Sequence, residues 1–300
     1  MKNFFKILAN TVNFFYGEIR GKHLAVASQA ELDLAATKPW WDMVTHIYCQ
    51  GAEITRMPKL PIALEELEAK NNPGLGDSLG QPNFFAHCKD LKKVFACRTP
   101  LRSPGQYVLD FSQNKHLQVL YVCDAEVTEI RFHPESELQQ LMADNCSLTG
   151  FEWLPTELRL LRVEHNRDLA GNRTFTKLPA VMPKRLEQLY VTGNDLAELP
   201  DLIQMSHLQH LYAAGNNLMA IEAWPDSLEQ IFLCRNKFVQ LPAVMPKSCY
   251  EFFLTSNQTE VQIPLLNEGQ TMDEFYVNHS KGAKAPMQVV LVKHRMGIAV

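Results

Sequence analysis

The sequence lacks three features that would point to common function classes: a long hydrophobic run, an excess of basic residues and a signature of catalysis. No stretch of its 300 residues approaches the roughly 18 consecutive apolar residues of a membrane-spanning helix. The formal net charge is −4 and no basic run occurs, so attraction to a phosphate backbone is weak. Neither a glycine-rich phosphate loop nor the zinc motif H-E-x-x-H is present. We therefore expect no enzyme activity, no cofactor or metal, no nucleic-acid partner and no integral membrane segment.

Cysteine provides no disulfide framework, because the seven cysteines are an odd number at irregular positions. Such usage is typical of a reducing compartment. A secretory signal is not expected either, since Lys6, Asn10 and Asn13 interrupt the apolar residues near the N-terminus. The apolar residues there share one face at helical spacing. They predict a helix over residues 1–19 that covers the core or, as the alternative, lies on a membrane surface.

A spacing of apolar residues recurs along most of the chain. In residues 186–200, LEQLYVTGNDLAELP, leucine or valine stands at positions one, four, six and eleven, and asparagine at position nine. This is the pattern of the leucine-rich repeat. It recurs at intervals of 20 to 28 residues, with starts at Val44, Leu64, Leu91, Leu117, Leu138, Leu158, Leu186, Leu208, Leu228, Cys249 and Met272. We predict an α/β leucine-rich-repeat solenoid of about eleven repeats, a right-handed curved superhelix with a parallel sheet on its concave face.

Two further repeated features shape this prediction. Asparagine at position nine is expected to bond backbone groups of the turn, with Thr99, Cys146 and Ser280 as partial substitutes in their repeats. Prolines four residues apart, in LPAVMP at 178–183 and 241–246, exclude an α-helix between them. The convex segments should therefore be mostly extended or 3-10, with room for a helical turn or an excursion at 82–90 and 102–115.

Both ends of a solenoid need a cap, because each repeat is buried only against its neighbours. Ser28 followed by Glu31 fits a capping box, which predicts a second helix that ends before Pro39. We predict an N-terminal helical cap at 1–43, a leucine-rich-repeat domain at 44–280 and a C-terminal cap strand and tail at 281–300. Residues 287–293, MQVVLVK, would form the strand; the alternative for this tail is an unstructured secretion signal.

The repeat unit L-P-x-x-x-P-x-x-L-x-x-L-x-V-x-x-N-x-L-x-x-L-P resembles the short leucine-rich repeat of bacterial effectors that pathogens inject by type III or type IV secretion. The match covers roughly residues 44–280 and is clearest over 154–264. The resemblance implies a virulence protein that leaves the bacterial cytoplasm and binds a host protein in the host cytoplasm. Some relatives carry a C-terminal ubiquitin-ligase domain. That activity is not expected here, because only about 20 residues follow the last repeat.

Side chains at positions five and seven of each repeat should face the concave surface, because strand residues alternate between faces. Position five is aromatic in eight of the eleven repeats, although aromatic residues make up only 9% of the chain. Rings on adjacent strands could form a stabilising ladder, or they could bind a protein partner. With Asp144 and Glu164 from position seven, the predicted partner-binding residues are Tyr48, Phe95, Tyr121, Met142, Asp144, Arg162, Glu164, Tyr190, Tyr212, Phe232, Phe253 and Tyr276. Asp144, Arg162, Glu164 and His165 would form a charged centre beside a gap in the ladder.

Cys97 and Cys123 occupy position seven of adjacent repeats. Adjacent strands would bring their sulfurs close enough for a disulfide or a soft metal, but no histidine is expected at the same height, so we predict free thiols. Three functions remain. The first is a secreted effector that binds a host protein, the second a resident bacterial cytoplasmic adaptor or inhibitor, and the third a thiol-dependent enzyme built on Cys97, Cys123 and Asp124. The oligomeric state is left open, with a monomer as the working expectation.

Overall fold

The computed structural model describes residues 22–100, 107–257 and 261–277. The chain divides into two compact units between Cys146 and Ser147, and each is described by itself. The helix expected over 1–19 and the strand expected over 287–293 lie outside the described residues.

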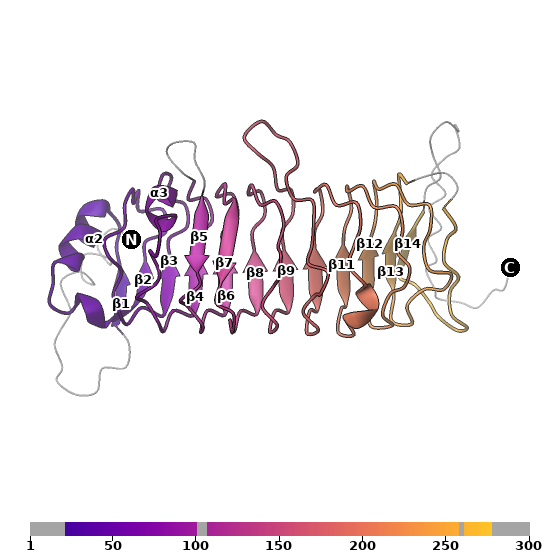
Figure 1. Ribbon diagram of the computed structural model, residues 1–300, viewed down its shortest axis with the longest axis horizontal. Coiled ribbons are helices and arrows are strands. Elements are labelled where there is room, and N and C mark those ends of the chain that lie inside the picture. Colours follow the sequence, from indigo (N-terminus) through magenta and orange to yellow (C-terminus); the bar gives the residue numbers. More distant parts are fainter. Residues whose placement is uncertain (1–21, 101–106, 258–260, 278–300) are drawn as a thin grey trace. The chain divides into compact units, whose positions relative to one another are not determined.

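Unit 1 is a parallel β-solenoid that begins with a strand and a short helix (Figure 1). Its main sheet has the order β1-β2-β3-β4-β6-β8, and every pair is parallel. The strands are β1 (Lys22–Ala25), β2 (Val44–Tyr48), β3 (Glu66–Glu68), β4 (Lys93–Phe95), β6 (Val119–Tyr121) and β8 (Gln140–Met142). A second parallel pair consists of β5 (Val108–Phe111) and β7 (Glu129–Phe132), and the helical segments are α2 (Gln29–Ala36), η1 (Trp41–Met43) and α3 (Gly76–Leu79).

Unit 2 has the same architecture. Its sheet has the order β9-β10-β11-β12-β13-β14, again with parallel pairs. The strands are β9 (Leu160–Arg162), β10 (Gln188–Tyr190), β11 (His210–Tyr212), β12 (Gln230–Phe232), β13 (Glu251–Phe253) and β14 (Glu274–Tyr276). Its convex segments contain one 3-10 turn, η2 (Leu202–Gln204), among the described residues. The leucine-rich-repeat fold is therefore confirmed, as are extended or 3-10 convex segments in this unit.

Burial alternates along the short strands as the repeat pattern requires. Leu189 and Leu211, the central residues of β10 and β11, are fully buried, whereas the next residues, Tyr190 and Tyr212, are partly exposed. The same order holds for Leu120 and Tyr121 of β6. The predicted inward and outward directions of these side chains are therefore confirmed.

A ladder of buried asparagines joins successive coils. The side-chain amide of Asn216 donates to the carbonyls of Val191 and Ala213 (3.0 and 3.1 Å), and its oxygen accepts from the N–H of Leu196 (3.1 Å). Asn72, Asn194, Asn236 and Asn257 bond in the same way. Each amide thus pairs backbone groups of two coils that would otherwise be buried without partners.

Two of the predicted asparagine substitutes bond a backbone carbonyl here, Thr99 within its own coil and Cys146 in the preceding coil. The Thr99 hydroxyl donates to the carbonyl of Ala96 (2.6 Å), and the Cys146 thiol donates to that of Val122 (3.2 Å). The third, Ser280, lies outside the described residues. Neither Thr99 nor Cys146 offers the second donor and the carbonyl acceptor of an amide, so these coils are joined by fewer bonds.

The described part of the N-terminal segment differs from an all-helical cap. The helix expected after Ser28 is present as α2, and the Ser28 hydroxyl accepts from the N–H of Glu31. However, β1 precedes it and pairs with β2, so the sheet begins before Val44. Val26, which follows β1, is buried like an inward residue of a repeat, and its N–H donates to the carbonyl of Tyr48. The parallel pairing with β2 therefore continues past the end of β1. The boundaries at 43 and 280 stay predictions.

Unit 1 also carries a feature on its convex side that the repeat pattern did not indicate. Strands β5 and β7 lie side by side there (Figure 1), with Leu109 and Phe111 packed inward from one and Ile130 and Phe132 from the other. Their sequences, VLDF and EIRF, alternate buried and more exposed residues with the period of a strand. The excursion expected at 102–115 therefore contains a strand.

Candidate functional site

Five aromatic rings form a continuous stack on the strand face of unit 2. They come from the last residue of five successive strands, β10 to β14, and we call them the aromatic ladder: Tyr190, Tyr212, Phe232, Phe253 and Tyr276. Successive ring centroids are 4.7, 4.3, 4.3 and 4.6 Å apart, and the interplanar angles lie between 9° and 28°. The parallel register places these residues directly opposite one another. The stack therefore follows from the strand spacing of about 4.8 Å together with one residue class at one position.

The ladder is anchored at one end by a charged pair. The Arg162 guanidinium lies over the ring of Tyr190, 5.7 Å from its centroid, and bonds the Glu164 carboxylate at 2.9 Å. Arg162 was expected to interrupt the stack; instead its planar cation extends it by a cation–π contact. Glu164 stays beside it, as expected. These two residues and the five rings lie together in unit 2.

Polar side chains from the first position of the strands run beside the ladder. The Tyr212 hydroxyl donates to Gln230 (3.0 Å), whose amide donates to Glu251 (2.9 Å). Burial among the rings raises the pKa of Tyr212 to about 12, so this hydroxyl stays protonated at neutral pH. Desolvation, and then Glu274, raise the pKa of the Glu251 carboxyl. These polar residues were not predicted from the sequence. The two-residue period of a strand could have indicated them, because it places the first strand residue on the same face as the ring.

A basic hollow borders the other side of the ladder. It measures about 440 Å³ and is lined by Arg167, Arg173, Arg235 and His165, with Thr192, Ala214 and Cys234 from the repeat position next to the rings. Arg173 is fixed by two bonds of 2.7 Å from Nη1 to the carbonyls of Asn194 and Gly215. Gly193 forms part of the floor at φ +73°, and a Cβ there would lie 2.1 Å from Nδ1 of His165. His165 and Arg235 hold the same left-handed conformation at φ +54° and +55°, so it is the close contact with the His165 ring that requires glycine at position 193.

The corresponding face of unit 1 is less regular. Phe95 and Tyr121 meet edge to face, with centroids 5.3 Å apart at 76°, and Glu68 separates Phe95 from Tyr48. The Lys70 ammonium lies 4.7 Å from the centre of the Phe95 ring. At the first end, His23 stacks on His46 at 4.0 Å and 6°. Unit 1 therefore presents charged and titratable groups where unit 2 presents a run of rings.

Two predicted site residues of unit 1 occupy different environments. Met142 ends β8 and is partly exposed, as expected for position five. Asp144 is only 7% exposed, so its carboxylate is largely covered, which differs from the open surface position expected for it. We therefore leave Asp144 out of the proposed binding surface. Arg162, Glu164 and His165 belong to unit 2, and the expected charged centre is described only for those three residues.

Cys97 and Cys123 lie side by side in unit 1. Both thiols are partly exposed, and the Cys123 thiol donates a hydrogen bond to the sulfur of Cys97. That bond lowers the pKa of Cys97, and Lys70 lowers it further; the same bond raises the pKa of Cys123, to which burial adds. The predicted proximity is confirmed, and the free state of the thiols stays a prediction. No group of three metal-ligating side chains occurs among the described residues.

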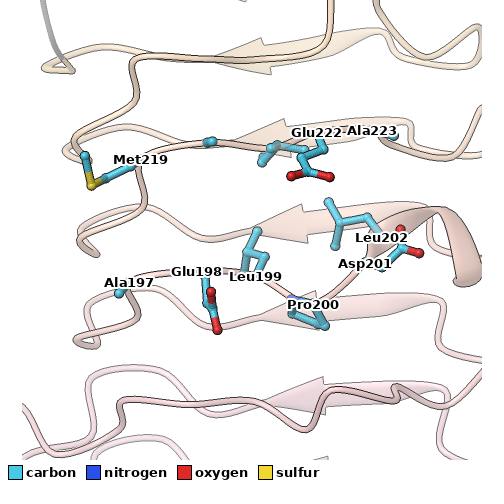
Figure 2. Close-up of a pocket in the computed structure, with 11 residues that line it drawn as sticks. Ala197, Glu198, Leu199, Pro200, Asp201, Leu202, Met219, Glu222 and Ala223 are labelled. Carbon is cyan, nitrogen blue, oxygen red and sulfur yellow. The ribbon is translucent and has the colours of Figure 1, made fainter.

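Two other features have different characters. A groove of about 450 Å³ lies between two coils of unit 2, where Glu198 and Asp201 of one coil face Met219 and Glu222 of the next (Figure 2). The expectation that the sequence has no signature of catalysis overlooked a G-x-S-x-G sequence at residues 76–80, the pattern of a hydrolase nucleophile. Ser78 is buried, however, and its hydroxyl accepts from the N–H of Met57 at 3.1 Å. It is therefore not positioned to attack a substrate.

Comparison with known proteins agrees with the fold. No family model matches the chain. It is 25% identical to mouse podocan-like protein 1 over 257 residues, which cover 74% of the chain and 45% of that protein. It is 34% identical to mouse podocan over 129 residues (40% and 21%) and 23% identical to human lumican over 243 residues (71% and 70%). The match thus spans less than half the length of the two podocans.

Solved structures of low sequence identity share the architecture. YopM, a leucine-rich effector protein from Yersinia pestis, superposes with a TM-score of 0.58 at 22% identity, covering 85% of this chain and 77% of YopM. YopM from Yersinia enterocolitica gives 0.53 at 20% identity, with 92% and 60% covered. The chain therefore has the leucine-rich-repeat fold. None of the helices in the described ranges is long and apolar enough to cross a membrane.

Proposed function

We propose that the chain is a protein-interaction module that binds its partner through the aromatic ladder of unit 2. The observation that carries the proposal is the unbroken stack from Tyr190 to Tyr276, whose members all remain partly exposed although the inward residues of β10 to β13 are fully buried. Aromatic side chains with an adjacent arginine are the residues that most often dominate binding energy at protein interfaces. No catalytic role is part of this proposal.

The groups on either side of the ladder indicate the chemistry of the partner. Three arginines line the hollow on one side, while Glu251 and Glu274 lie on the strand row of the other. A partner that places an apolar segment on the rings and a carboxylate over the arginines would satisfy the rings and the arginines. Association should then slow as salt concentration rises, because the arginine side is exposed to solvent.

We further propose that the partner is a host protein and that the chain acts as a secreted bacterial effector. The likeness to YopM in fold and the repeat unit itself support this proposal. Two alternatives compete with this proposal. The mouse and human relatives favour a protein that acts outside bacteria, and the second alternative is a resident bacterial adaptor. The three differ in where the partner is found.

The test is capture of a partner from eukaryotic and bacterial lysates, followed by affinity measurement with the purified partner. The variant Tyr190→Ala/Phe232→Ala should lower affinity by at least about thirtyfold, since truncating even one anchor residue of an interface costs about 2 kcal/mol or more. The matched control is Val181→Ala/Val239→Ala, which truncates exposed apolar residues of unit 2 outside the strands. Equal affinity of ladder variant and wild type would overturn the surface. Capture from the bacterial lysate alone would overturn the effector proposal and leave the surface intact.

A further inference from the structure

The two thiols on the face of unit 1 stand opposite each other by register. Strands β4 and β6 pair with Phe95 opposite Tyr121. Cys97 and Cys123 each lie two residues past the end of their strand, so they are opposite each other as well. The backbone hydrogen bonds between the two segments continue through the cysteines, because the N–H of Arg98 donates to the carbonyl of Cys123 at 2.8 Å. Neighbouring strands are about 4.8 Å apart, within the roughly 4.4 to 6.8 Å between Cα atoms that a disulfide spans.

The surroundings of the pair favour reaction at Cys97. Both sulfurs are partly exposed, so a small reagent can reach them. The Cys123 thiol donates to Cys97, and the Lys70 ammonium, held over the adjacent Phe95 ring, is close enough to stabilise negative charge on that sulfur. These contacts lower the pKa of Cys97, which raises the fraction of the nucleophilic thiolate at neutral pH.

The other five cysteines lack this arrangement. Cys49, Cys88, Cys146 and Cys249 are buried, and burial raises the pKa of each to about 12. Cys234 is the informative comparison, since it occupies the same repeat position as Cys97 and Cys123 and is also partly exposed. Its neighbours at that position are Ala214 and Thr255. It is thus a surface thiol with no second thiol opposite it.

We propose that Cys97 and Cys123 form a reversible disulfide by exchange with a low-molecular-weight disulfide such as oxidised glutathione. In the first step the Cys97 thiolate attacks one glutathione sulfur, forming a mixed disulfide and releasing a glutathione thiolate. In the second, Cys123 loses its proton to solvent and attacks the Cys97 sulfur, which forms the intramolecular bond and releases a second glutathione. The two cysteines are oxidised by two electrons, and one glutathione disulfide is reduced to two thiols.

The geometry also indicates that this bond would be easily reduced. Side chains directly opposite on parallel strands keep their Cβ atoms near the strand separation of about 4.8 Å, whereas a relaxed disulfide prefers about 3.8 Å. The two strands must therefore move together locally. Strained, exposed disulfides are the labile and regulatory ones rather than the structural ones.

The test is to equilibrate the full chain with defined ratios of reduced and oxidised glutathione and to measure intact mass and the linked peptides. The wild type should lose two hydrogen atoms at the Cys97–Cys123 pair and recover them when excess reduced glutathione is added. Cys123→Ser should stop at a glutathione adduct on Cys97. In Cys97→Ser the adduct on Cys123 should form several-fold more slowly at pH 7.

Cys234 serves as the internal control, because it can form only the glutathione adduct. Adduct formation at Cys97 should reach half its maximal rate below the pH of about 8.5 expected for an ordinary thiol. A wild type that carries stable adducts on Cys97 or Cys123 and no intramolecular bond would overturn the proposal. So would a bond that excess reduced glutathione does not open. Circular dichroism of each serine variant verifies that it is folded.

Discussion

The outward faces of the two units differ, although the same repeat builds both. In unit 2 five rings stack without interruption, and the coils from Leu186 onward recur every 20 to 23 residues. In unit 1, Glu68 interrupts the row of rings, and the coils that start at Leu64 and Leu91 are longer, at 27 and 26 residues. The same face carries a thiol pair and a stacked histidine pair. The inward strand residues of the repeats are buried in both, apart from Phe275 in β14 of unit 2. The repeat therefore specifies the core, and the outward positions are free to carry different chemistry.

The largest effect should come from the core, and it should be the same in both units. Leu120→Ala and Leu211→Ala each remove a fully buried side chain, so each should lower the free energy of unfolding by about 2 to 5 kcal/mol. Tyr212→Ala removes two stacking contacts and should cost no more than about 2 kcal/mol. Urea denaturation measures all three. A loss for Tyr212→Ala as large as that for Leu211→Ala would mean that the ladder is part of the core.

Replacing the residue at position nine of a repeat should lower the free energy of unfolding by a smaller amount, and that amount should differ between the units. Asn216→Ala leaves the N–H of Leu196 buried without its acceptor, while the carbonyls of Val191 and Ala213 each keep one amide donor, so the loss should be about 1 to 3 kcal/mol. Thr99→Val in unit 1 removes the hydroxyl bonds to the Ala96 carbonyl (2.6 Å) and the Tyr107 hydroxyl (3.4 Å) and should cost about 1 kcal/mol, most of it from the shorter bond. Equilibrium denaturation of the two variants gives the difference. Equal losses would show that the amide does not join two coils energetically.

Filling the gap in unit 1 should make it more like unit 2. Glu68→Tyr would place a ring between Tyr48 and Phe95, with a gain of about 0.2 to 1 kcal/mol for each cross-strand pair. The ion pair that it removes, Glu68 to Lys70 at 3.5 Å, is partly exposed and contributes little. A higher midpoint in thermal denaturation is expected. Phe232→Glu, the reverse change in unit 2, should lower the midpoint.

The smallest effect concerns pH and has opposite signs at the ends of the two units. Burial, and then His23, lower the pKa of His46, with Glu66, Glu65 and Lys93 as the other charged neighbours. The folded state therefore binds fewer protons than the unfolded state, and stability is lost as pH falls below about 6.5. His46→Gln should weaken this loss, as measured by urea midpoints at pH 7.5 and 5.5.

Glu251 in unit 2 provides the contrast. Its raised pKa means that the folded state binds the proton more tightly than the unfolded state, so this contribution to stability is lost as pH rises through the folded pKa. Glu251→Gln should therefore raise the midpoint at neutral pH relative to that at pH 4. A variant with an unchanged pH profile would show that Glu274 and burial do not act on this carboxyl.

Much of the fold could be predicted because the repeat combines two simple periods. The coil interval gives the solenoid, and the alternation within a strand gives the direction of Leu189 against Tyr190. Asn216 and its equivalents could be assigned because a side-chain amide offers two donor hydrogens and a carbonyl acceptor at such a turn. The sequence VLDF also alternates, but its pairing with EIRF depends on how two long coils fold back, and no local pattern contains that information.

The site was less predictable for a related reason. Alternation gives the direction of a side chain but not its cover, so Asp144 was expected on the surface and is buried. Arg162 was expected to end the stack, but its guanidinium lies over Tyr190. The basic hollow brings Arg167 and Arg173 from one coil to Arg235 of another, and their proximity depends on turn conformations such as that of Gly193.

The asparagine bonds of unit 2 also have a consequence for how such a chain can change in length. Asn194, Asn216 and Asn236 each bond their own coil and the one before, using backbone groups that every coil presents in the same place. Removal of one whole coil, such as residues 208–227, would bring together edges that already fit. Duplication would do the same and add one ring to the ladder. The binding face can therefore be lengthened or shortened by whole coils while the remaining ones keep their bonds.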